Sequence, residues 1–341
     1  MTSDLTAALA DFFTATWPTD TPIAEPGPLA SSRWSPFAAL GLHLVGVPEE
    51  SGGSGGTIDD LVALAVLAGR HAADVPVAEA TTAGWAAAEA GLPVEPSASS
   101  SMPVAPVSLV LHDDSTVTGT LRDVPWGGSV DRVVTITDDG HTVVLAPQDA
   151  QVVPGIDLAG QPRDTLVFER VAPVATGTGL RAEQAHRRAA VLRIALSAGA
   201  LQACSELTRR YVSERVQFGR PIGTFQAVQA HVVQIEQMAV MATAVAQRLA
   251  LQGDPHDLDL AAARLVTSEN AQTAARAAHQ AHGAIGMTRE YRLQGYTRRL
   301  HTWAGDLGEE MELSRRLGAT AARAASFAHL VFDDNRPELR P

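Results

Sequence analysis

The stretch Tyr211-Val-Ser-Glu-Arg-Val-Gln-Phe-Gly-Arg-Pro-Ile-Gly-Thr-Phe-Gln-Ala-Val-Gln229 decides the fold, because it separates two long apolar segments that lack proline. A glycine followed two residues later by a proline predicts a long helix that ends at Gly219, and a second helix that begins near Thr224. Arg215 and Gln217 lie at this corner. A guanidinium beside free backbone amides is suited to bind a phosphate or pyrophosphate. A plain helix hairpin with a surface arginine is the alternative.

The segments around this corner have helical periodicity. In residues 181–214 apolar side chains recur on two adjacent sides, which indicates a helix buried between neighbours. Residues 225–251, 257–282 and 307–330 repeat the pattern. Four long, alanine-rich helices predict a four-helix bundle, and apolar residues on several faces predict an oligomer.

The preceding part of the chain has two different patterns. Short helices are predicted over residues 4–16, 57–73 and 83–91, with a loop over 18–33. Short β-branched runs bounded by turn residues predict strands over 107–111, 116–121, 132–137, 142–147 and 165–168. A stretch rich in Pro, Ser and Ala, from Pro93 to Pro106, predicts a boundary between them.

The predicted fold is therefore mostly α with a small β domain. The expected domains are a reduced N-terminal helical domain (residues 1–103), a small barrel-like β domain (104–172), a C-terminal four-helix bundle (173–332) and a tail (333–341).

Composition excludes several classes of function. All 26 residues counted as Lys or Arg are arginine, which rules out a Schiff-base lysine and a phosphate-loop lysine. A net charge of −12 without a basic tract argues against nucleic acid as a partner. We expect no metal site, because no His or Cys cluster has ligand spacing. The single Cys204 is expected to be inert. The absence of a long apolar run and of a basic leader predicts a cytoplasmic protein without a membrane span.

Two strings of residues are more specific. Residues 215–226 are Arg-Val-Gln-Phe-Gly-Arg-Pro-Ile-Gly-Thr-Phe-Gln, and residues 280–291 are Gln-Ala-His-Gly-Ala-Ile-Gly-Met-Thr-Arg-Glu-Tyr. They resemble the Arg-x-x-Phe-Gly-x-Pro-Ile-x-x-Phe-Gln and Gln-x-x-Gly-Gly-x-Gly-x-x-x-Glu-Tyr motifs of the acyl-CoA dehydrogenase family. Ala284 replaces the second glycine of the latter motif. The resemblance is specific over residues 180–305 and looser over residues 35–140.

The resemblance implies a chemistry and points to a missing group. In this family FAD oxidises an acyl-CoA: a carboxylate removes the α proton and the flavin accepts the β hydride. The two positions at which the family carries this base correspond to Ala304 and Ala189, and alanine has no proton acceptor. Asp306 is the candidate for a displaced base. Glu309 and Glu310 could also substitute, although two acids at a helix N-terminus explain them more simply.

The resemblance also implies cofactor contacts. In the family both motifs mostly contact the ADP half of FAD bound by a neighbouring subunit. The corresponding residues here are Arg215, Gln217, Phe218, Gly219, Gln280, Gly283 and Ala284. Trp126 is the candidate for a flavin contact in the β domain, with packing of that domain as the alternative. The helices that would cover this subunit's own flavin and acyl chain are reduced.

These features together suggest a subunit of a FAD-dependent acyl-CoA dehydrogenase that shares FAD across an interface and lacks the usual glutamate. The resemblance implies a full-length partner subunit in a heterotetramer, as in actinobacterial members acting on steroid side-chain CoA thioesters. It also implies a fatty or bulky acyl-CoA as substrate, and electron-transfer flavoprotein as a candidate acceptor. The alternatives are a self-sufficient homo-oligomeric dehydrogenase with a displaced base, a non-catalytic structural subunit, and an acyl-CoA oxidase.

Overall fold

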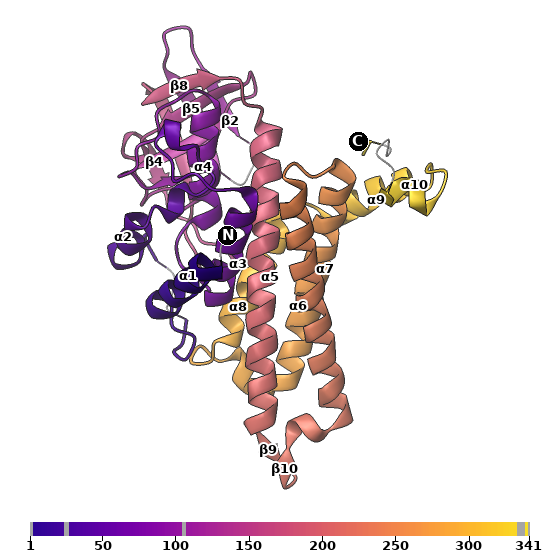
Figure 1. Ribbon diagram of the computed structural model, residues 1–341. Coiled ribbons are helices and arrows are strands. Elements are labelled where there is room, and N and C mark those ends of the chain that lie inside the picture. The colour runs from indigo at the N-terminus through magenta and orange to yellow at the C-terminus, as the bar shows by residue number, and fades with distance from the viewer. Residues whose placement is uncertain (1–2, 24–26, 104–106, 333–337, 340–341) are drawn as a thin grey trace. The chain divides into compact units, whose positions relative to one another are not determined.

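The computed structural model describes residues 3–23, 27–103, 107–332 and 338–339. They belong to two compact units, Met1–Leu192 and Arg193–Pro341 (Figure 1). The first unit contains helices and strands, and the second is almost entirely helical. The predicted class, mostly α with a small β portion, is confirmed. The finer division into three domains and a tail stays a prediction, and only Glu338 and Leu339 of that tail are described.

Four helices open the first unit. They are α1 (Ser3–Thr16), α2 (Ser31–Ala39), α3 (Ile58–His71) and α4 (Val77–Glu89), with single 3₁₀ turns at Leu42–Leu44 and Glu49–Ser51. The start of α3 is fixed by a capping box, in which the Thr57 hydroxyl accepts from the Asp60 amide and the Asp60 carboxylate accepts from the Thr57 amide. The helix predicted over residues 83–91 begins earlier, at Val77, directly after Pro76.

Eight strands of the first unit form two four-stranded sheets. They are β1 (Ser100–Ser101), β2 (Ser108–Leu111), β3 (Val117–Pro125), β4 (Arg132–Ile136), β5 (His141–Leu145), β6 (Gln151–Val153), β7 (Arg163–Val171) and β8 (Ala175–Thr178), with a 3₁₀ turn at Pro147–Asp149. The sheet orders are β1-β4-β5-β8 and β2-β3-β7-β6. Only the β1–β4 pair is parallel among these described strands. All five predicted strands are present, whereas the short β1, β6 and β8 were missed.

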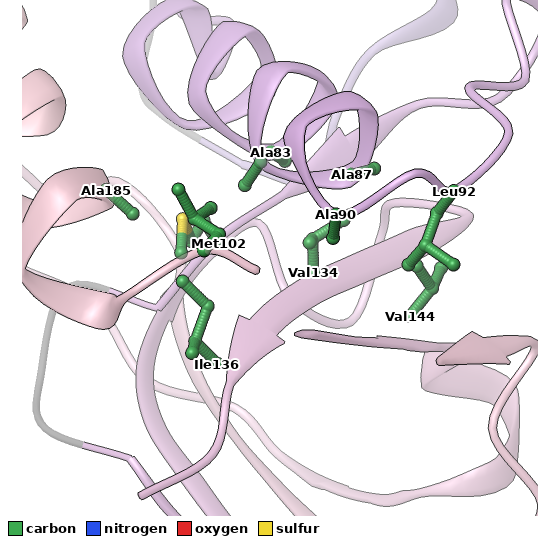
Figure 2. Packing of buried hydrophobic residues seen from close by; sticks show 11 residues of the cluster. Ala83, Ala87, Ala90, Leu92, Met102, Val134, Ile136, Val144 and Ala185 are labelled. Carbon is green, nitrogen blue, oxygen red and sulfur yellow. The ribbon is translucent and has the colours of Figure 1, made fainter. Parts of the chain in front are cut away.

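The sheet containing β4 and β5 is buried on both faces. Val133 on β4 points into a core shared with the second sheet, where Leu166 and Phe168 of β7 are fully buried. The next residue, Val134, points to the opposite face, which α4 covers with alanines such as Ala83 (Figure 2). This alternation is the period-two pattern of a strand with apolar neighbours on both sides. The predicted barrel-like β domain is thus present as two sheets packed face to face.

The second unit is a helical bundle with a small hairpin. Its elements are α5 (Ala182–Glu214, which starts in the first unit), β9 (Val216–Gln217), β10 (Arg220–Pro221), α6 (Gln226–Gln252), α7 (Asp257–His282), α8 (Leu293–Asp306), α9 (Glu310–Ala321) and α10 (Phe327–Phe332). Side chains link α5 to α6, as in the hydrogen bond from Gln202 to Thr243 (2.9 Å), and α7 packs against α6, α8 and α9.

The membership of the bundle differs from the prediction. The fourth long helix is α8 and not residues 307–330, which divide into α9 and α10. The periodicity of α8 was overlooked because its buried face combines Tyr296 and Trp303 with polar residues such as Arg299. A new helix begins after Ser326, whose hydroxyl caps the His329 amide at 3.1 Å.

Helix α5 is, within the described residues, long and apolar enough to cross a membrane by length and composition. However, 89% of its apolar window is buried inside the folded chain. A buried core helix passes the same test, so α5 fits the central helix of a bundle.

The shared core of the two sheets should be sensitive to truncation. Phe168 is 0% exposed there, so Phe168→Ala should lower the free energy of unfolding by about 3–5 kcal/mol. Val110 on β2 is 59% exposed, and Val110→Ala should change it by less than about 0.5 kcal/mol. Urea unfolding followed by fluorescence measures both variants. Similar losses in the two variants would contradict the assigned core.

Candidate cofactor-binding surface of the helical unit

The corner after α5 is a β-hairpin and not a helix terminus. The prediction that α5 ends at Gly219 is wrong, because the helix ends at Glu214 and the strands β9 and β10 follow. Phe218 (φ 51°) and Gly219 (φ 77°) connect these strands, and two positive φ angles are typical of a type I′ turn. The positive φ of the glycine therefore serves the hairpin. We call residues 215–221 the hairpin tip; it lies at one end of α5 and α6 (Figure 1).

The hairpin tip packs against the residues that follow it, whereas its turn is exposed to solvent. The ring of Phe225 contacts Phe218 edge-on at 6.0 Å between centroids, and the Arg220 guanidinium lies 4.3 Å over the Phe225 ring. The Ile222 amide donates to the Arg215 carbonyl at 2.8 Å, which closes the base of the hairpin. Phe218 is nonetheless 91% exposed. The hairpin tip therefore presents a large apolar ring to the solvent.

Arg215 and Gln217 are two polar groups of the tip with unused hydrogen-bonding capacity. Both side chains are exposed, and among the described residues neither forms an ion pair or a side-chain hydrogen bond. A Cβ atom placed on Gly219 would have no heavy atom within 4 Å. The hairpin tip therefore presents the unpaired guanidinium of Arg215, and a ligand could approach the backbone at Gly219.

The second motif forms the C-terminal end of α7 and a 3₁₀ turn, η5 (Gly283–Met287). We call residues 280–287 the Gln280 loop. Gly283 has a φ of 64°, and its amide donates to the His279 carbonyl at the end of α7. Gln280, Gly283 and Ala284 are all exposed. Ala284 has no positive φ, so the backbone there does not require the glycine that this chain lacks.

An aromatic cluster joins the two motifs. The ring of Tyr211, at the end of α5, stacks on His282 with 4.5 Å between centroids and an interplanar angle of 20°. Tyr291 contacts Tyr211 at 5.9 Å and His282 at 5.2 Å. Tyr211 precedes the hairpin tip in sequence, whereas His282 and Tyr291 belong to the second motif. The cluster therefore brings the hairpin tip and the Gln280 loop to the same end of the helical unit.

Burial favours the neutral forms of His282 and Tyr291. Burial lowers the pKa of His282, although a hydrogen bond from Nδ1 to the Ala278 carbonyl (2.8 Å) acts in the opposite direction. Burial also raises the pKa of Tyr291 to about 12. The positive charge of the hairpin tip is contributed by its exposed arginines, Arg215 and Arg220.

Trp126 belongs to the first unit, where it lies in the core shared by the two sheets and is only 4% exposed. This burial favours the packing alternative for its ring. Its backbone has a φ of 51° at the end of β3.

The structure shows the burial and the side-chain partners of each position that was considered for a catalytic base. Ala304 is buried on α8, and Ala189 is half-buried on α5. Asp306 forms an ion pair with Arg193, with 2.9 Å between Oδ2 and Nε, and the two side chains are 12% and 8% exposed. Glu309 is the N-cap residue of α9, and Glu310 accepts hydrogen bonds from Ser268 and Gln272. Both glutamates therefore lie at the N-terminus of α9, the position that the helix-terminus explanation assumes.

The residues at this end of the helical unit fit a diphosphate group. Arg215 supplies an unpaired guanidinium, Gln217 and Gln280 supply exposed amides, and Gly219 and Gly283 leave open space where a Cβ would stand. Guanidinium and amide donors bind phosphate oxygens well, and glycine permits close approach. No group of three His, Cys, Asp or Glu side chains that could hold a metal ion occurs in the part of the chain that the structure describes.

Comparison with known proteins agrees with the motifs. Residues 177–309 match the family described as acyl-CoA dehydrogenase, C-terminal domain. The chain is 31% identical over 286 residues to acyl-CoA dehydrogenase IpdE2 of Mycobacterium tuberculosis, covering 82% of each chain. It is 32% identical over 307 residues to acyl-CoA dehydrogenase FadE34 of the same organism, covering 85% of this chain and 42% of that protein.

Solved structures share the fold. A chain of the ChsE4-ChsE5 complex from Mycobacterium tuberculosis superposes with a TM-score of 0.79 at 22% identity, covering 95% of this chain and 97% of the other. The Tcur3481-Tcur3483 steroid ACAD superposes with a TM-score of 0.79 at 24% identity, covering 93% and 96%. At these identities the similarity shows the fold alone.

The buried imidazole of the cluster should make stability depend on pH. Its folded pKa is below the unfolded value of about 6.5, so the unfolded chain binds more protons and stability falls as pH drops below about 6.5. His282→Phe keeps a stacked ring without this titration. It should therefore lose less stability between about pH 7 and pH 5 than the unmodified chain.

Unfolding midpoints measured across this pH range test the prediction. The control is Met287→Ala, since Met287 is 69% exposed on the Gln280 loop and carries no titratable group, so the original pH dependence should be retained. An unchanged pH dependence in His282→Phe would show that the cluster does not contain the buried neutral histidine described here.

Proposed function

The chain belongs to the acyl-CoA dehydrogenase family, and from this premise we propose that it acts as a subunit that shares FAD with a full-length partner subunit. The hairpin tip and the Gln280 loop would contact the ADP half of a FAD molecule held mainly by that partner. The observation that carries the proposal is the pairing of these two exposed motifs by the Tyr211–His282–Tyr291 cluster. Arg215, Gln217 and Gln280 are exposed donors in these motifs.

Each residue has a role that its chemistry supports. The Arg215 guanidinium would donate hydrogen bonds to diphosphate oxygens, and the amides of Gln217 and Gln280 would donate further ones. Gly283 permits the backbone to approach the cofactor. Phe218 provides an apolar face against the partner or the adenine ring, because its own chain leaves the ring 91% exposed.

When bound, FAD supplies the redox chemistry by accepting a hydride from the β carbon of the acyl group. The residues of this chain bind and orient the cofactor, and the partner would supply the carboxylate that removes the α proton. Ala304 and Ala189 have no acceptor for that proton. Asp306 is engaged by Arg193 at 2.9 Å, so protonating it would weaken a largely buried ion pair.

The nature of the relatives supports a narrower proposal. Because solved neighbours are described as a complex of two different chains and as a steroid ACAD, we propose a heterotetramer that oxidises a bulky, steroid-like acyl-CoA in the cytoplasm. A reduced N-terminal helical portion would leave more room for such a substrate. Electron-transfer flavoprotein is the proposed acceptor of the electrons.

The cofactor contact is tested in the complex co-expressed with its partner. Arg215→Ala should raise the dissociation constant for FAD about ten- to a hundredfold, since a charge-assisted hydrogen bond contributes about 1.5–3 kcal/mol. Flavin absorbance after equilibrium dialysis measures the bound fraction. Arg323→Ala, which removes an exposed arginine elsewhere, should retain the original affinity. Equal FAD affinity in both variants would argue for a purely structural subunit.

A test of Asp306 distinguishes the proposed shared site from a self-sufficient dehydrogenase that uses Asp306 as its base. Asp306→Asn should lower the free energy of unfolding by about 1–3 kcal/mol, because Arg193 loses its charged partner. The turnover of the assembled complex should change less than threefold. Glu309→Gln, at an exposed position, is the matched control. A loss of turnover at unchanged FAD content would identify Asp306 as a base and overturn the proposal that the partner supplies it.

A further inference from the structure

The segment that leaves α7 contacts the helices through a single buried residue. After α7 ends at His282, residues 283–290 run along the surface, and Gly286 is the one buried residue in that range. Its neighbours Ile285 and Met287 are 42% and 69% exposed. The η5 turn contacts both α7 and α8. The distance between this part of the Gln280 loop and the helices is therefore set at Gly286.

The two glycines of the η5 turn have different structural roles. Gly283 has a φ of 64°, a conformation that favours glycine, and a Cβ placed there would meet no heavy atom within 4 Å. Gly286 has no positive φ, so its backbone conformation is open to other residues. The reason for a glycine at position 286 must therefore be space and not conformation.

A side chain at position 286 would meet both helices that support the loop. A Cβ placed on Gly286 would lie 3.0 Å from the Cβ of His282 on α7 and 3.0 Å from Cδ2 of Leu293 on α8. It would also lie 3.3 Å from Nδ1 of His279. Non-bonded carbon atoms have their optimal separation at about 3.5–4.0 Å, so the two carbon contacts would be repulsive. The loop can lie this close to α7 and α8 because the Cβ is absent.

The atoms around Gly286 are held in place by the bundle. The Cβ of His282 is attached directly to the backbone of α7, and its ring belongs to the aromatic cluster. Leu293 is 0% exposed. His279 lies 2.9 Å from the Thr297 hydroxyl, measured from Nε2 to Oγ1, and this contact joins α7 to α8. A new side chain at position 286 would therefore displace the exposed loop more readily than the packed helices.

We propose that Gly286 is a positioning residue for the cofactor contact, although it does not touch the cofactor itself. By packing without a side chain against His282 and Leu293, it fixes the place at which the loop presents Gln280 and Gly283. This inference rests on the proposed function and adds a residue that acts through the loop. Hydrogen bonds depend steeply on distance and angle, so a small displacement of the loop weakens those that Gln280 makes.

An alanine at position 286 tests this role in the complex co-expressed with its partner. Gly286→Ala should raise the dissociation constant for FAD about tenfold, because the displaced loop loses part of its hydrogen bonding. Equilibrium dialysis followed by flavin absorbance measures the constant. Gly318→Ala, at an exposed position of α9 where a Cβ would meet no heavy atom within 4 Å, is the matched control and should keep the original affinity. Equal affinities in the two variants would overturn the proposal.

A second substitution distinguishes positioning from a general loss of stability. Leu293→Val removes the Cδ2 atom that lies 3.0 Å from the position of the new Cβ and opens space on the side of α8. The double variant Gly286→Ala/Leu293→Val should therefore recover most of the lost FAD affinity, although Leu293→Val by itself lowers stability by leaving a cavity. A double variant that binds FAD no better than Gly286→Ala would contradict the positioning role.

Hydrogen exchange of the isolated full chain tests the displacement without FAD. Peptides that cover residues 283–291 should exchange faster in Gly286→Ala than in the unmodified chain, whereas peptides from residues 262–278 of α7 should be unchanged. Unchanged exchange over residues 283–291 would overturn the positioning role, even where Arg215→Ala weakens FAD binding. Faster exchange over that range, with FAD affinity unaffected by both Gly286→Ala and Arg215→Ala, would instead refute the shared cofactor site itself.

Discussion

The stacking of Tyr211 on His282, with Tyr291 against both, is the contact on which the proposed function depends. It connects the end of α5 to the end of α7 and thereby places two distant motifs at one end of the helical unit. Burial keeps the histidine neutral, so the stack has no unpaired buried charge.

The charged side chains of the helical unit differ in whether they have a partner within the chain. Where the family is expected to carry its base, the chain has alanines, and the nearby Asp306 is engaged by Arg193. At the hairpin tip, in contrast, Arg215 has no internal partner among the described residues. A folded chain normally satisfies its cations or leaves them scattered in solvent. Arg215 is left exposed at the hairpin tip together with Phe218 and Gly219, which is consistent with the proposed cofactor contact.

Much of the fold could be predicted from the sequence, because helical and strand periodicities are local. The helices α1, α3, α6 and α7 and five strands were predicted close to their observed bounds. The end of α5 was not predicted correctly, because a glycine after a long helix is compatible with both a helix C-terminus and a hairpin turn. Only the pairing of β9 with β10 distinguishes these two structures. Helix α8 was missed because its face contains Arg299 and Tyr296, whose burial depends on distant neighbours. The motifs identified the candidate residues. That the two motifs lie near each other could not be predicted, because it depends on tertiary contacts.

The central claim is that Arg215 faces a cofactor held by another polypeptide. The most direct test is the distance between the Arg215 guanidinium and the FAD diphosphate in a solved structure of the chain with its co-purified partner. The account predicts hydrogen bonds of about 2.7–2.9 Å between guanidinium nitrogens and phosphate oxygens of FAD whose flavin ring lies in the partner. An Arg215 side chain in solvent, with every FAD molecule enclosed by a single subunit, would contradict it.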